Sequence, residues 1–401
     1  FLKRKIRAEI NIIILASFFS LYLVEGIINI LVSFAEPAIY NKKLLDKKFD
    51  TRSRIEVLID ERKKYPNAVV TALPLSFASD VNSKILPLAG ISNRKTVFCN
   101  ELGYWVTYQS DKFGFRNPDQ EWAKDKIEYL LVGDSLTHGM CVNEKDTISG
   151  NLRHTLNNKR YAVLNLGMWG DGPLLMFAKI REYLEKNKTS KVLWIYCEGN
   201  DLQDFYYEKK NKILMKYLQN KSFSQNLKTK QDLINISLKR HLLDEEKKKM
   251  NYLNDDYSFN IINYIKLSEI RKLTINRINK KKIEQDLEIR PLNYLDDFEK
   301  IIKIANKFVK SKGSELYFVY LPDYFARANL DQKNLYGNEK IESYELIKEF
   351  LKEQDIKLVD IQELVFKNHS DPLSLFPFRG FGHFNEEGYK LVAESIIKLD
   401  D

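Results

Sequence analysis

Ser135, in the segment Gly133-Asp134-Ser135-Leu136, is the strongest candidate for a nucleophile in this sequence. It follows a short apolar run, residues 127–132, with the length and composition of a buried strand. A serine on a glycine turn at the end of such a strand projects its hydroxyl into the open edge of a sheet, where substrates bind. The tripeptide also fits a simple helix N-cap, so its meaning depends on residues elsewhere in the chain.

Three further segments follow Ser135, and each supplies a group that serine chemistry needs. Residues 165–170 follow a second apolar run and end in Gly170, whose backbone N–H is free to face an anion. Asn200 follows a third apolar run and carries an amide donor, although a plain turn explains both of these segments. His383 precedes an amphipathic C-terminal helix, and histidine is the side chain best suited to accept a serine proton near neutral pH.

Together these segments resemble the signature of the GDSL, or SGNH, hydrolase family, whose signature residues correspond to Ser135, Gly170, Asn200 and His383. The resemblance covers roughly residues 127–201 and 314–398. It implies a serine esterase or O-acyl transferase, with no cofactor, in which Ser135 attacks an ester carbonyl and His383 acts as the base. It also implies an oxyanion hole made by the N–H groups of Ser135 and Gly170 and by the Asn200 amide.

The acid that usually precedes the histidine in that family is missing here, because Gly380 and Phe381 occupy its positions. Two alternatives stay open at the level of the sequence. A backbone carbonyl near Gly380 accepts the Nδ1–H of His383, or Asp371 reaches back as the orienting acid. The same gap supports a rival hypothesis, in which the chain is a catalytically weak binding or assembly protein of the cell envelope that retains the fold.

Apolar runs and amphipathic stretches alternate from residue 127 onward and predict the elements that position these groups. Expected strands lie at 127–132, 161–165, 191–197, 316–321 and 356–361, and expected helices at 146–157, 173–187, 296–311, 341–354 and 386–398. This alternation predicts an α/β, flavodoxin-like three-layer sandwich with a parallel sheet. A further strand is expected within 101–108. The insertion at about 202–290 is expected to be helical, either as a lid or partner surface or as an excursion on the flank of the sheet.

The N-terminal residues predict one transmembrane helix. The basic segment at residues 3–7 precedes an apolar stretch, residues 10–34, that is long enough for one span. The basic residues before this stretch and the large domain after it place the N-terminus in the cytoplasm. Glu25 within it costs about 2.5–3.5 kcal/mol on insertion scales. A cleaved signal peptide is the alternative, because residues 33–35 have the small-x-small form of a cleavage site.

The predicted organisation is a membrane anchor at 1–35, a stalk and accessory segment at 36–125, and a hydrolase-like domain at 126–401. In either N-terminal alternative, the catalytic part is expected to lie outside the cytoplasm, in the periplasm or the extracellular space. The expected partners are the membrane, through the N-terminal helix, and an acylated glycan or a small ester.

Composition and cysteine spacing limit the kinds of partner and bound metal that this chain is expected to have. The net charge of +9 comes from lysines and arginines that are spread along the chain among acids, so nucleic acid is not an expected partner. Of the three cysteines, Cys197 ends an expected strand, whereas Cys99 and Cys141 lie in expected loops and are predicted to pair in an oxidising compartment. The cysteine and histidine spacing indicates no metal site.

Overall fold

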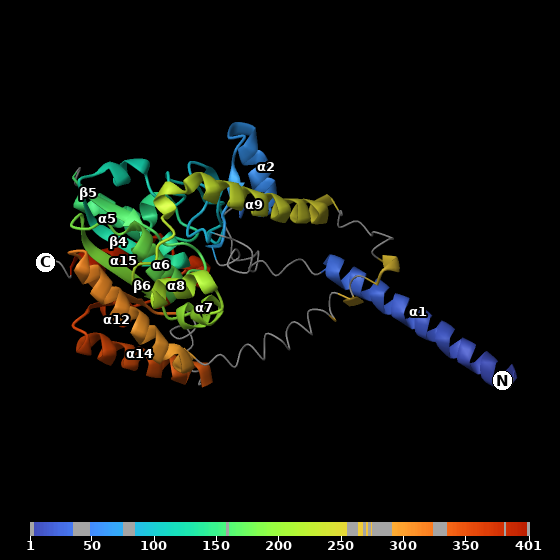
Figure 1. Cartoon of the computed structure of the whole chain (residues 1–401). Helices are drawn as coiled ribbons and strands as arrows, with labels where there is room; N and C mark the ends of the chain where they lie inside the picture. Colours follow the sequence, from blue (N-terminus) through green and yellow to red (C-terminus); the bar gives the residue numbers. More distant parts are fainter. Residues whose placement is uncertain are drawn as a thin grey trace. The chain divides into compact units, whose positions relative to one another are not determined.

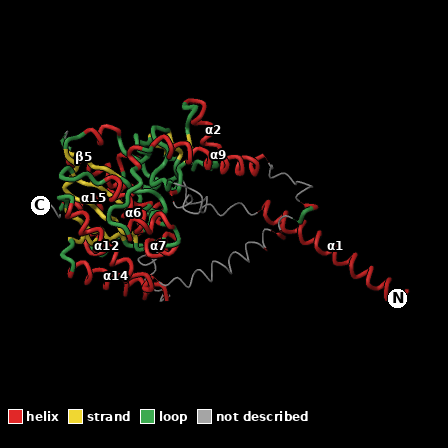
Figure 2. Tube along the Cα trace, in the orientation of Figure 1, coloured by secondary structure: helices red, strands yellow, loops and turns green. Residues whose placement is uncertain are grey.

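The computed structural model describes residues 4–34, 49–74, 85–157, 160–254, 264–267, 270–271, 274, 291–323, 335–380 and 382–398 (Figures 1 and 2). The chain divides into two compact units, one formed by Phe1–Lys48 and Glu245–Glu288 and one formed by Phe49–Asp244 and Ile289–Asp401. The second unit contains every site residue that the sequence singles out.

A five-stranded parallel sheet forms the centre of the second unit. Its strands are β4 (Lys126–Gly133), β5 (Tyr161–Asn165), β6 (Thr189–Cys197), β7 (Glu315–Leu321) and β8 (Lys357–Asp360). Their order is β5-β4-β6-β7-β8, and every neighbouring pair is parallel. This is the doubly wound, flavodoxin-like order, so the predicted fold class is confirmed. In such sheets, ligands bind beyond the carboxyl ends of the strands, where the strand order reverses, which is between β4 and β6 here.

Helices cover both faces of the sheet (Figure 1). One face packs against α6 (Pro173–Tyr183), α12 (Leu295–Ser311) and α14 (Leu335–Glu353), and the other packs against α5 (Ile148–Leu156) and α15 (Glu386–Ile397). Successive strand residues point to opposite faces, so the same strands contribute side chains to the hydrophobic cores on both sides of the sheet. Because the strands are buried on both sides, their sequences read as nearly continuous apolar runs. The yellow strands of Figure 2 therefore lie between two layers of red helices.

Residues 49–74 and 85–125 pack as part of the same unit. Helix α2 (Arg54–Lys64) begins with a capping box from Ser53 and Glu56 and buries three apolar side chains, those of Ile55, Val57 and Leu58. A small sheet follows, made of β1 (Val69–Val70), β2 (Lys95–Val97) and β3 (Thr107–Gln109), and then the turn η2 (Asp119–Ala123). Residues 49–74 and 85–125 of the segment expected to be a stalk and accessory region are thus folded into the second unit.

Of the strand expected within 101–108, only the last two residues belong to an observed strand, β3. The residues before it form a turn instead, in which the Asn100 side chain accepts a hydrogen bond from the Gly103 N–H at 2.9 Å. Gly103 has a φ of +88°, which glycine adopts readily and which no regular strand contains. Aromatic composition alone therefore overestimated the length of this strand.

The first half of the insertion is helical, as expected. It contains α7 (Asp201–Glu208), α8 (Lys212–Gln219), the turn η4 (Leu227–Thr229) and α9 (Gln231–Asn254). The apolar side chains of Leu227, Ile234, Leu238 and Leu242 are buried in the core. Hydrogen bonds also join Gln225 to Leu86 and Asn235 to Ser92. Residues 202–244 thus pack on the flank of the domain. The parts of the insertion at 255–263, 268–269, 272–273 and 275–290 lie outside the described residues.

Short turns complete the second unit. They are α4 (Ser135–His138), η3 (Glu144–Asp146), η5 (Pro291–Tyr294), the π-helical turn η6 (Gln362–Phe366), η7 (Pro372–Leu375) and η8 (Pro377–Arg379).

The first unit contains α1 (Arg4–Phe34), whose segment Arg4–Ile28 has a mean hydropathy of 2.0. Among the described residues it is the one helix long and apolar enough to cross a membrane, and it fits a single-pass anchor or a signal sequence. Glu25 on this helix is fully buried, and its carboxylate accepts a hydrogen bond from the Ile270 N–H at 2.9 Å. The Tyr264 hydroxyl donates to the Tyr22 carbonyl at 2.8 Å. A piece of the insertion therefore covers the acid within α1.

Candidate active site

Ser135 lies where the sequence places it, on the turn that follows β4. A Cβ on Gly133 would lie 2.7 Å from the Ile195 carbonyl and would also collide with the Thr137 hydroxyl, so only glycine fits at the end of this strand. The Asp134 side chain caps the short helix α4 by accepting a hydrogen bond from the Leu136 N–H at 3.0 Å. The strand end and the cap together fix the serine at the first position of α4, at the edge where the strand order reverses.

His383 reaches Ser135 from a loop that is 248 residues away in the sequence. Its Nε2 lies 2.9 Å from the Ser135 Oγ, which is the distance of a hydrogen bond between base and nucleophile. Asn385, the N-cap of α15, holds this loop in place: its side chain accepts from the Gly388 N–H at 3.1 Å and donates to the Ser374 carbonyl at 2.7 Å. The two candidate catalytic residues that the sequence indicates are therefore brought together.

The acid that orients the histidine is Glu101. Its Oε1 lies 2.8 Å from the His383 Nδ1, and its Oε2 accepts the backbone N–H of the same histidine at 2.9 Å. Both sequence-based alternatives are wrong. Asp371 is engaged by Arg379, whose Nη2 donates to it at 2.9 Å, and a carboxylate rather than a carbonyl near Gly380 faces the Nδ1. The geometry is a Ser–His–Glu triad.

The electrostatics of Glu101 suit this role. Burial by itself would raise the pKa of its carboxyl group, but the hydrogen bonds and charge of His383 outweigh burial and hold that pKa below its ordinary value. The carboxylate is therefore ionised at neutral pH. It holds the imidazole with its proton on Nδ1, which leaves the Nε2 lone pair facing the serine hydroxyl.

Glu101 was missed because no local pattern marks it, but one signal did point toward it. Cys99 and Cys141 form the expected disulfide, with their Cα atoms 5.2 Å apart. Cys141 lies shortly after the nucleophile turn, and Cys99 lies two residues before Glu101. The predicted disulfide was therefore a signal that could have brought Glu101 into consideration, because it links the segment of Glu101 to the segment of Ser135.

Gly170 lies in the loop formed by residues 168–172, here named the oxyanion loop, which follows β5. Its φ is +80°, and a Cβ at this position would meet nothing within 4 Å, so the residue borders open space. Among the hydrogen bonds of the described residues, neither the Ser135 N–H nor the Gly170 N–H is a donor. Both N–H groups are thus available to an oxyanion, in line with the predicted role.

Asn200 follows β6, and β6 pairs with β4 up to Gly133 and Ile195, so Asn200 and Ser135 emerge at the same edge of the sheet. One of its amide hydrogens donates to Asp204 at 2.6 Å, which fixes the side chain. An amide carries two such hydrogens, so a donor remains for substrate. Burial raises the pKa of Asp204 to about 7, although the hydrogen bond from Asn200 lowers it.

Two buried acidic side chains hold the oxyanion loop by accepting hydrogen bonds from its backbone. The Asp171 carboxylate accepts the Met168 N–H at 2.9 Å and forms an ion pair with Lys179, and neither charged side chain is exposed. Burial raises the pKa of Asp171 to about 7, against the effect of Lys179. The Glu208 carboxylate accepts three N–H groups, those of Gly172, Leu174 and Leu175, and so caps the N-terminus of α6.

A second histidine, His138, is buried behind the loop and does not act as the base. Its Nδ1 accepts the Trp169 N–H at 3.3 Å, and its Nε2 lies 3.3 Å from the Tyr108 hydroxyl. Burial, with the positive charge of Arg116 nearby, lowers the pKa of His138 well below its ordinary value. The neutral ring therefore acts as a fixed acceptor that positions the oxyanion loop.

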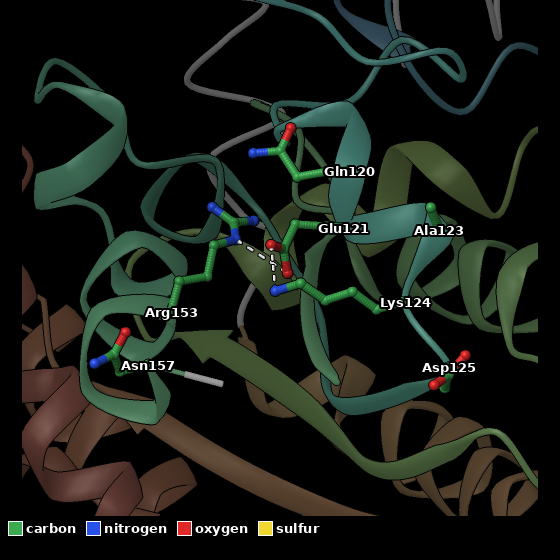
Figure 3. A pocket seen from close by; sticks show the side chains of 7 residues that line it. All are labelled: Gln120, Glu121, Ala123, Lys124, Asp125, Arg153 and Asn157. Atoms are coloured by element: carbon green, nitrogen blue, oxygen red, sulfur yellow. Dashed lines mark ion pairs between the residues drawn. The ribbon is translucent and has the colours of Figure 1, made fainter. Parts of the chain in front are cut away.

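A pocket of about 620 Å³ lies elsewhere (Figure 3). Residues 120, 121 and 123–125 line it together with Arg153 and Asn157, so it borders the amino end of β4, whereas Ser135 follows the carboxyl end. Its Glu121 pairs with Lys124 at 2.6 Å and with Arg153 at 3.9 Å. This pocket is therefore separate from the candidate active site. Within the described residues, no group of three His, Cys, Asp or Glu side chains is arranged to hold a metal ion.

Comparisons with known proteins place solved esterases among the similar structures. A lipolytic protein of the G-D-S-L family from Veillonella parvula is 14% identical, with 68% of this chain and 97% of that chain covered and a TM-score of 0.36. An acetyl xylan esterase, AlAXEase, is 10% identical, with 68% and 98% covered and a TM-score of 0.38. An acetylxylan esterase from Geobacillus stearothermophilus is 14% identical, with 69% and 94% covered and a TM-score of 0.36. No family model and no curated protein matches the sequence.

Proposed function

We propose that this chain is a serine esterase of the GDSL type. The observation that carries the proposal is the line of contacts from the Ser135 Oγ to the His383 Nε2, at 2.9 Å, and from the His383 Nδ1 to Glu101, at 2.8 Å. A nucleophile hydrogen-bonded to a base that is itself oriented by a carboxylate is the arrangement that activates a serine.

The reaction proceeds in two halves. His383 takes the hydroxyl proton as Ser135 attacks the ester carbonyl, and the Ser135 and Gly170 N–H groups with the Asn200 amide hold the oxyanion. The protonated imidazole then gives its proton to the departing alcohol, which leaves an acyl-serine. A water molecule attacks this intermediate and His383 accepts the water proton. His383 then returns that proton to the Ser135 Oγ as the bond between the acyl group and the serine breaks, which releases the carboxylic acid and restores the enzyme.

The proposal also covers the compartment and the substrate of the enzyme. Basic residues at the start of α1 and the disulfide between Cys99 and Cys141 support a domain anchored in the membrane and exposed to the periplasm or the extracellular space. The substrate is an acylated glycan of the envelope or an exopolysaccharide, with a glycan hydroxyl as the alternative acyl acceptor. A periplasm-active reporter fused after Asp401 is expected to be active, and activity of a cytoplasm-only reporter there would contradict this topology.

Covalent labelling of the serine tests the chemistry directly. The full-length protein in detergent is expected to react with a fluorophosphonate probe at Ser135, and Ser135→Ala is expected to lose both the labelling and the hydrolysis of 4-nitrophenyl acetate. Ser395→Ala is a matched control, because its hydroxyl is bonded within α15 to the Leu391 carbonyl. Hydrolysis that survives Ser135→Ala in full would support the catalytically weak binding protein instead.

A further inference from the structure

Arg54, the first residue of α2, contacts the oxyanion loop. Its guanidinium carbon lies 5.6 Å from the ring centroid of Trp169, the residue before Gly170. The side chain is half-buried, and this burial lowers the pKa of Arg54 from its ordinary value. A positive charge is therefore held, partly removed from water, next to a residue of the proposed oxyanion hole.

The segment before Arg54 is bonded to the other side of the active site. The Asp50 N–H donates to the Gly103 carbonyl at 2.9 Å, and the Trp105 indole N–H donates to the Arg52 carbonyl at 3.0 Å. Both contacts fall on the turn that carries Glu101. The backbone just before Arg54 thus contacts the turn that carries Glu101, whereas the Arg54 side chain contacts the oxyanion loop.

No carboxylate of the described residues forms an ion pair or hydrogen bond with Arg54. The acids near it in the sequence are already engaged: Asp50 and Asp60 with Arg52, and Glu56 with the Ser53 N–H. A cation over an indole ring gains about 0.5–2 kcal/mol, which does not replace an anionic partner for a partly desolvated guanidinium. The geometry leaves Arg54 with a charge that a ligand can satisfy.

We propose that Arg54 forms a subsite that binds a carboxylate of the substrate, so that the preferred ester is an O-acylated glycan containing uronic acid residues. This inference rests on the proposed esterase function and adds its substrate class. The planar guanidinium presents two parallel N–H groups that match a carboxylate. One guanidinium also matches the single negative charge of a carboxylate better than the higher charge of a phosphate monoester.

The test compares two substrates that differ in charge. We expect the ratio of kcat/KM for an O-acetylated oligogalacturonide to kcat/KM for an O-acetylated oligoxyloside to fall about tenfold in Arg54→Gln, the effect of losing one charged hydrogen bond. Arg54→Lys is expected to keep part of the preference, and added salt to reduce it in the wild type. Lys64→Gln removes the same charge from the opposite end of α2 and serves as the matched control that leaves the ratio unchanged.

Calorimetric binding of deacylated oligogalacturonide to the full-length protein separates this inference from the function it rests on. If Ser135 is labelled and esters are cleaved, but Arg54→Gln changes neither the substrate ratio nor the binding, the carboxylate subsite is wrong and the esterase stands. If no ester is cleaved and Ser135 is not labelled, but oligogalacturonide binds and Arg54→Gln abolishes that binding, the subsite stands and the esterase proposal is wrong. Equal competition by inorganic phosphate would overturn the choice of a carboxylate.

Discussion

Glu101→Gln is the substitution that most directly tests the triad. Both carboxylate oxygens are used, one by the His383 Nδ1 at 2.8 Å and one by the His383 N–H at 2.9 Å. Glutamine keeps the shape but supplies only one oxygen. If that oxygen stays on the backbone N–H, which can only donate, the amide NH₂ faces Nδ1. The imidazole must then carry its proton on Nε2 and can no longer accept the proton of Ser135.

The magnitude follows from the two arrangements of this amide. A base locked in the wrong tautomer costs about 10⁴ in rate, which is about 5.5 kcal/mol of barrier. The flipped amide restores the right tautomer but sets its NH₂ against the backbone N–H and loses a charged hydrogen bond, which costs about 1.5–3 kcal/mol or more. We therefore expect kcat to fall between about 10² and 10⁴, with KM changing little, since Glu101 touches the base and not the substrate.

The assay is steady-state hydrolysis of 4-nitrophenyl acetate, together with circular dichroism to confirm folding. Asp371→Asn is the matched control, because it removes the acid that the sequence offered and that the structure pairs with Arg379. The pKa of Glu101 lies below its ordinary value, so its effect is present at neutral pH and is lost only as the pH falls through that lowered pKa. A loss below threefold in Glu101→Gln, with a large loss in Asp371→Asn, would refute the reasoning.

The remaining predictions concern the parts that hold the site. Asn200→Ala is expected to lower kcat by about 10²–10³, as for one oxyanion donor, and an unchanged kcat would remove it from that role. His138→Phe removes the acceptor behind the oxyanion loop and is expected to lower kcat about tenfold at constant KM, whereas His138→Asn should recover part of the loss. Burial raises the pKa of Asp204 from 3.8 to about 7, so the free energy of unfolding should fall as the pH rises between these values. Urea unfolding at several pH values should show a smaller fall in Asp204→Asn than in the wild type. Replacing both Cys99 and Cys141 by alanine removes a crosslink between residues 42 apart and should lower the free energy of unfolding in urea by about 2–5 kcal/mol. No change in either stability or kcat would show that the disulfide does not hold the loop of the orienting acid.

Much of the fold could be predicted from the sequence because its signals are local. The five strands of the main sheet are buried on both faces, so each one reads as an apolar run, and the helices that cover them read as amphipathic stretches. A parallel sheet then forces residues that follow different strands to one edge. That rule places Ser135, Gly170 and Asn200 at the same end of the sheet from the sequence alone. His383 is identified by the amphipathic helix that it precedes.

The packing between distant segments had no local signature. Glu101 and His383 are 282 residues apart, and the choice of Glu101 over Asp371 depends on how two loops meet, with one held by a disulfide and the other by the cap of α15. Residues 54–64 fall in the segment expected to be a stalk and accessory region, yet they form α2, because one side of a short polar helix is enough to bury Ile55, Val57 and Leu58. Sequence patterns report which residues prefer to be buried or to turn, whereas the partner of a charged side chain depends on which surfaces come into contact in the folded chain.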